Sequence, residues 1–69
     1  MKTEQLELLN ALGYQEQESN NAYMRSFTDG IRRVNVYTTG TIQIQWTENG
    51  KNRQIIDRNP SLEELEKSL

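Results

Sequence analysis

Three glycines spaced ten residues apart most constrain what this chain can fold into. Gly30, Gly40 and Gly50 each follow or separate short segments in which apolar and polar side chains alternate. Asp29-Gly30 and Asn49-Gly50 favour two-residue hairpin turns, because these residues tolerate positive φ angles. Alternating segments joined by such turns are typical of antiparallel strands. The sequence therefore predicts a meander of four strands, over 22–28, 31–37, 41–47 and 51–57.

The register of the two central strands follows from keeping the apolar side chains on one face. A three-residue turn over 38–40 pairs Val36 with Ile42, whereas a two-residue turn would set Val36 beside Gln43 and mix the faces. We therefore expect the three-residue turn, with Gly40 in the left-handed region that such a turn requires.

The outer turns predict the remaining pairs. The Asn49-Gly50 turn places Ile44 opposite Ile55 and Trp46 opposite Arg53, and a two-residue turn at Asp29-Gly30 places Tyr23 opposite Val36. One face of the sheet then carries the expected core, with Trp46 as its largest side chain. The predicted core residues of the strands are Tyr23, Phe27, Val34, Val36, Ile42, Ile44, Trp46 and Ile55.

A short amphipathic helix is expected at each end of the chain. Leucines recur at helical spacing over 3–12, and Gly13 should end that helix in a Schellman motif with Tyr14 contacting Leu9. Residues 15–21 hold no apolar side chain and are predicted to be a solvated connector.

The second helix is expected to begin after Ser61, which forms a capping box with Glu64, and to bury one leucine stripe, Leu62, Leu65 and Leu69. Residues 1–69 are thus predicted to form one α+β domain. Its element order is α-β-β-β-β-α, with a four-stranded antiparallel meander and both helices on one face.

The composition argues against catalysis. The chain of 69 residues has no Cys and no His, so it lacks thiolate chemistry, the commonest metal ligand and the usual near-neutral acid–base group. No pair of carboxylates is placed for acid–base work, and each glycine is explained by a turn. We therefore expect a non-enzymatic protein without cofactor or metal. The absence of a signal-peptide pattern and of a membrane-spanning apolar run favours a cytoplasmic location.

Charge separates the expected sheet from the expected helices. Residues 21–58 hold six basic and three acidic side chains, whereas residues 1–20 have a net charge of −3 and residues 59–69 one of −2. The face opposite the core should be rich in amides and hydrogen-bond donors. The predicted ligand-binding residues on that outer face are Arg33, Asn35, Tyr37, Gln43, Gln45, Gln54 and Arg58.

The stretch from Val34 to Trp46, VNVYTTGTIQIQW, resembles a strand–turn–strand of small domains with the TATA-binding-protein-like fold, such as the one at the N-terminus of type-three ribonucleases H. The likeness is carried by Tyr37, Thr39, Gly40, Thr41 and Gln45. It implies helices on one face and a concave sheet that grips nucleic acid.

Two function hypotheses follow. The first is a protein-binding or inhibitor module, with a protein partner or a second copy bound at the polar face or at an open edge strand. The expected edges are 22–28 and 51–58. The alternative is a weak nucleic-acid-binding module that uses the outer sheet face, where arginines contact phosphates.

Overall fold

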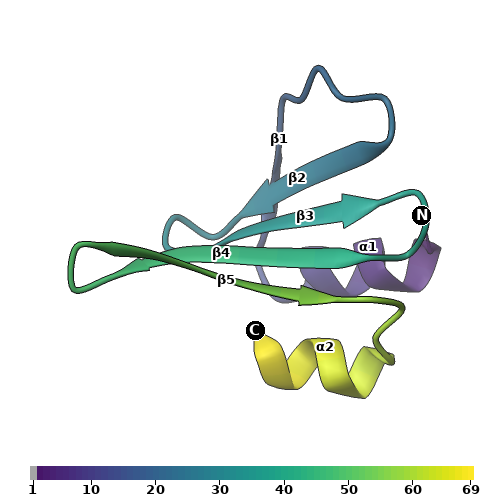
Figure 1. Cartoon of the computed structure of the whole chain (residues 1–69). Coiled ribbons are helices and arrows are strands. Elements are labelled where there is room, and N and C mark those ends of the chain that lie inside the picture. The colour runs from purple at the N-terminus through teal and green to yellow at the C-terminus, as the bar shows by residue number, and fades with distance from the viewer. Residues whose placement is uncertain (1) are drawn as a thin grey trace.

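The chain folds into one antiparallel sheet with two helices on the same side of it, as the computed structural model shows for residues 2–69 (Figure 1). Helix α1 (Thr3–Ala11) precedes the sheet and helix α2 (Leu62–Ser68) follows it. The five strands pair in chain order: β1 (Gln15–Gln17), β2 (Met24–Thr28), β3 (Arg33–Tyr37), β4 (Ile42–Glu48) and β5 (Lys51–Asp57). The predicted α+β class is confirmed, and the sheet has one strand more than the sequence indicated.

The core lies between the helices and one face of the sheet. Leu9 of α1 and Leu65 of α2 are fully buried against strand residues that alternate along each strand. Burying one face of each strand is what the period-two pattern of apolar residues requires. The buried apolar residues are Leu9, Tyr14, Phe27, Val34, Val36, Ile42, Ile44 and Leu65.

Two of the three predicted turns are confirmed. Val36 pairs with Ile42 across residues 38–40, where Gly40 has a φ angle of 90°. At the other end of β4, Ile44 pairs with Ile55. Asn49 and Gly50 both have positive φ, as a two-residue hairpin turn of this type needs.

The predicted two-residue turn at Asp29-Gly30 is wrong, because the connection is a four-residue loop over 29–32. The Asp29 carboxylate Oδ1 accepts hydrogen bonds from the backbone N–H groups of Arg32 and Ile31, each at 2.8 Å, which hold the pKa of Asp29 below its usual value. An aspartate whose side chain accepts hydrogen bonds from the backbone of the next residues stabilises a turn at that position. Phe27 consequently pairs with Val34.

This wider loop shifts the predicted pairing of β2 by two residues, which leaves its faces unchanged but moves Tyr23 out of the sheet. Arg25 takes the place opposite Val36 that was predicted for Tyr23. The Tyr23 side chain is 72% exposed and is not part of the core.

Residues 15–17 form the extra strand β1, although they were predicted to be solvated connector. Glu16 lies opposite Phe27, and its carboxylate accepts two hydrogen bonds from the guanidinium of Arg25, at 2.5 and 2.7 Å. This bidentate contact lowers the pKa of Glu16. The strand is therefore held by backbone pairing and an ion pair, and it has no apolar side chain from which it could be predicted.

The two predicted helix ends, at Gly13 and at Ser61, are confirmed. The Tyr14 N–H donates to the Leu9 carbonyl at 2.9 Å, which completes the Schellman motif at Gly13, and the capping box of Ser61 and Glu64 is present. At the start of α1 the capping residue is Lys2, without a side-chain hydrogen bond. In the predicted stripes, Leu12 is 42% exposed and Leu62 is 45% exposed; Leu12 is the C-cap of α1 and Leu62 is the first residue of α2.

Trp46 is a side chain at the margin of the core, not its centre. It is partly buried and packs against the core cluster, and the guanidinium of Arg32 lies 5.8 Å from its ring centre. The pairing of β3 with β4 ends at Arg33 and Gln45, so Trp46 has β5 on one side only. Ile55, also predicted as core, is 39% exposed because β5 is an edge strand.

Truncation should separate the true centre of the core from its margin. Ile44→Ala removes a side chain that is 1% exposed and should lower the free energy of unfolding by about 2–5 kcal/mol. Trp46→Ala should cost less than Ile44→Ala, because part of the indole is already in water. Urea unfolding of both variants measures the difference, and a larger loss for Trp46→Ala would contradict this placement of the core.

Candidate functional site: an open strand edge and an arginine-lined groove

The outer face of the sheet carries a row of hydrogen-bonded side chains that crosses four strands. Ser26 Oγ donates to Asn35 Oδ1 at 2.7 Å, and Asn35 Nδ2 donates to Gln43 Oε1 at 3.0 Å and to Gln45 Oε1 at 3.3 Å. Gln43 Nε2 then donates to Gln54 Oε1 at 2.9 Å. We call this set the amide row; it consists of Ser26, Asn35, Tyr37, Gln43, Gln45 and Gln54.

The amide row uses much of its hydrogen-bonding capacity internally. Gln43 Oε1 accepts from both Asn35 and the Tyr37 hydroxyl, the latter at 3.2 Å. Asn35 is 6% exposed, so it holds its neighbours rather than contacting a ligand. Among the described residues, the amide nitrogens of Gln45 and Gln54 have no hydrogen-bond partner, and they remain the groups of the row that can reach outward.

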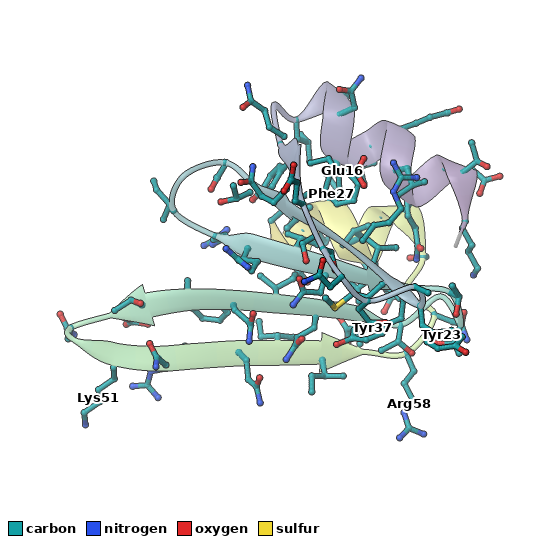
Figure 2. The ribbon with its side chains drawn as sticks, turned by 90° about the horizontal axis from the view of Figure 1, so that it is seen from above. Glu16, Tyr23, Phe27, Tyr37, Lys51 and Arg58 are labelled. Atoms are coloured by element: carbon teal, nitrogen blue, oxygen red, sulfur yellow. The ribbon has the colours of Figure 1, made fainter. Side chains whose placement is uncertain are left out.

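The two arginines predicted for this face do not lie together. Arg33 begins β3, is exposed, and pairs with Gln45 at one end of the outer face. Arg58 follows the last residue of β5 and points away from the sheet, as Figure 2 shows. The seven predicted site residues therefore divide into a buried or self-bonded centre and two separate charges.

Arg33 belongs instead to a groove of about 620 Å³ that the sequence did not reveal. We call it the arginine groove: it is lined by the guanidinium-bearing residues Arg32, Arg33 and Arg53, by Trp46, and by polar residues that include Gln45 and Gln54. The described residues that line it include no carboxylate. The predicted register sets Trp46 opposite Arg53 and places Arg32 at the same end of the sheet, and the structure adds Arg33 to this set.

Strand β5 is the long open edge of the sheet. Six of its seven residues are exposed, and only Asp57 is partly covered. Figure 2 shows β5, in pale green, at one border of the sheet, with both helices lying towards the opposite border. Exposed apolar side chains occur on it as well, since Ile55 is 39% and Ile56 is 56% exposed.

Alternation along β5 identifies the backbone groups that face outward. Glu48 and Lys51 flank a two-residue turn and exchange hydrogen bonds, and in an antiparallel pair such residues alternate with residues whose N–H and C=O point the other way. Asn52, Gln54 and Ile56 therefore present their backbone N–H and C=O groups to the open side.

The opposite edge is closed by β1. The prediction that residues 22–28 form an edge strand is wrong, because β1 pairs with β2 over Gln15–Gln17. Strand β1 is only three residues long and carries the charge of Glu16. Short and charged edges are those that natural sheets use to prevent further pairing, so β5 is the edge that can accept a strand.

Among residues 2–69 there is no cluster of His, Cys, Asp and Glu that could hold a metal ion, and no helix long and apolar enough to cross a membrane. Comparisons with protein-family models, with curated proteins and with solved structures gave no match to this chain.

A substitution within the amide row should show that its centre is structural. Asn35→Ala removes the acceptor of the Ser26 hydroxyl, which is 3% exposed and would be left unpaired, so unfolding should become easier by about 1–3 kcal/mol. Gln54→Ala changes the exposed end of the same row and should stay within about 0.5 kcal/mol of the parent. Equal losses in urea unfolding would contradict this division.

Proposed function

We propose that this protein is a small non-enzymatic protein-binding module whose partner adds an extended strand to β5. The observation that carries the proposal is the edge itself, a seven-residue strand with three outward-facing backbone positions that no element of the described residues 2–69 covers. Strand addition draws its affinity from main-chain hydrogen bonds and its specificity from alternate side chains. Both requirements are met along β5.

The two halves of β5 differ in polarity, so a partner strand can be recognised in one orientation. Lys51 and Arg53 place charges on the half next to the turn, as protected edges do, but Ile55 and Ile56 are adjacent and exposed on the other half. Ile56 also lines a groove of about 230 Å³ with Tyr37 and Gln43 on the outer face. A partner strand would cover Ile56 and set polar side chains beside the amide row.

Two changes should block strand addition without disturbing the fold. Gln54→Pro removes an N–H that faces outward and is not bonded to β4, a position where an edge strand tolerates proline. Ile56→Lys places a charge on the apolar half of the edge. Leu12→Lys is the matched control, because Leu12 is 42% exposed at the C-terminal end of α1 and lines neither groove.

The measurement is capture of proteins from an extract of the source cells by the immobilised chain, quantified by mass spectrometry. We expect a discrete partner that the parent and Leu12→Lys retain and that Gln54→Pro and Ile56→Lys lose. Because main-chain bonds carry the contact, retention should change little with salt. A partner retained equally by both edge variants would place the binding surface elsewhere.

We infer a second candidate function, weak binding of single-stranded nucleic acid at the edge of the outer face, from the arginine groove. Three guanidiniums and an indole without a lining carboxylate are suited to phosphates and stacked bases. The internal bonding of the amide row leaves few groups to read base edges. This candidate therefore predicts affinity governed by phosphate contacts, at about the micromolar level and fading towards physiological salt.

Arg33→Ala tests this candidate against Arg58→Ala. Loss of a phosphate contact should weaken binding to all sequences and reduce the dependence of log K on log salt by about 0.7–0.9. Arg58 lies outside the groove, so Arg58→Ala should change binding much less. Titration of labelled single-stranded DNA and RNA at several salt concentrations measures both. If both substitutions weaken binding equally, the affinity reflects the overall positive charge of the sheet and not contacts in the arginine groove.

A further inference from the structure

We propose that the strand accepted by β5 is β5 of a second copy of this chain, antiparallel, with Gln54 on the two-fold axis. The inference rests on the proposed function and names its partner. In this register each residue of the seven faces one of the partner strand: Lys51 faces Asp57, Asn52 faces Ile56, Arg53 faces Ile55, and Gln54 faces its own copy.

The backbone permits this register. The outward-facing groups of β5 belong to Asn52, Gln54 and Ile56, and the two-fold at Gln54 brings these positions onto one another. Antiparallel pairing then gives three hydrogen-bonded residue pairs with two bonds each, and the partner's groups are satisfied by symmetry. Every residue of the strand is paired, so no outward N–H or C=O within it is left over.

The opposite charges at the two ends of β5 face each other across the interface only if the two copies of the strand are antiparallel. Lys51 begins the strand and Asp57 ends it, on the same face. Within the described residues the ion pairs are Arg25 with Glu16 and Lys67 with Glu63, so neither end of β5 is engaged. Across the two-fold, each lysine meets an aspartate in a non-hydrogen-bonded pair, where Cα atoms are about 4.5 Å apart and side chains approach most closely.

The amide row continues through the same axis. Gln54 Oε1 accepts from Gln43, and the Gln54 amide nitrogen is without a partner among the described residues. Opposite its own copy, that nitrogen can donate to the second lone pair of the facing Oε1. Ile56 is covered at the same time by the strand that carries the facing Asn52.

Neighbouring registers are less suited to the strand. A shift that places Arg53 on the axis sets two guanidiniums opposite each other, which is destabilising. A shift that places Ile55 on the axis pairs Arg53 with Asp57 but matches only the five residues 53–57 and leaves Lys51 without a partner strand. The register centred on Gln54 alone combines full-length pairing with opposite charges at both ends.

The geometry also ends the assembly at two copies. A two-fold pairing uses the same edge on both molecules and closes on itself. The remaining edge of each sheet is β1, which is three residues long and carries Glu16. The dimer is thus one continuous sheet with the helices of both copies on one side.

The test uses the full chain and two charge reversals, Lys51→Asp and Asp57→Lys. Each one alone creates like charges at both ends of the interface and should weaken self-association by about tenfold. In an equimolar mixture, the introduced aspartate at position 51 faces the introduced lysine at position 57, and the native Asp57 faces the native Lys51. The mixture should therefore dimerise as the parent does.

Sedimentation velocity up to about 1 mM protein suits a small interface of this kind, with NMR spectra to verify that each variant is folded. Recovery in the mixture supports the register. A mixture no more dimeric than its components, or a Lys51→Asp variant that dimerises like the parent, overturns it; the latter result fits the register with Ile55 on the axis.

A parent that stays monomeric throughout overturns the second copy as the occupant. The proposed function is judged separately: if Gln54→Pro then still abolishes capture of a protein from the extract, β5 accepts a foreign strand. If neither dimer nor edge-dependent capture is found, both proposals fail.

Discussion

One row of apolar side chains, running across the strands, holds the sheet in register. Phe27 pairs with Val34, Val34 with Ile44, and Ile44 with Ile55, so that four strands are joined by consecutive contacts on the core face. A slip of one residue at any pairing would turn a whole strand over and expose its apolar set. The helices contribute Leu9 and Leu65 to the cover of this row.

The same row explains the chemistry of both the outer face and the edge. Because the intervening residues must point away from the core, they form a second row in which amides bond to one another. The core row is complete at its centre and incomplete at its end, where Ile55 lies on the last strand and is 39% exposed. The edge is therefore open in its backbone and partly uncovered in its side chains.

Sequence reasoning succeeded where a pattern repeats over several strands and failed where a single side chain decides. The pairing of Val36 with Ile42 and of Ile44 with Ile55 followed from alternation and turn residues. The carboxylate of Asp29 accepts hydrogen bonds from backbone N–H groups and so widens its loop. The alternation of apolar and polar residues in the flanking strands does not predict this loop length. Strand β1 was missed because it contributes no apolar residue, only backbone pairing and an ion pair.

The candidate site shows the same division. The predicted amides and Tyr37 do share one face, but their bonding to one another was not foreseen, since an exposed amide and a self-bonded amide look alike in sequence. Missing β1 also misplaced one edge, which left β5 and β2 as equal choices. The arginine groove was not predicted: Arg33 was assigned to the outer face alone, whereas it lines the groove together with Arg32, Arg53 and Trp46.

The edge and the groove are not independent surfaces. Asn52, Arg53 and Gln54 belong to β5 and also line the arginine groove. A strand added to β5 would lie directly beside these side chains, and in the two-fold register Arg53 would face the Ile55 of the second copy. An anionic ligand in the groove would draw the same guanidinium towards itself. Whatever occupies one surface therefore changes the other, and the two proposed activities are expected to compete through Arg53 rather than to coexist.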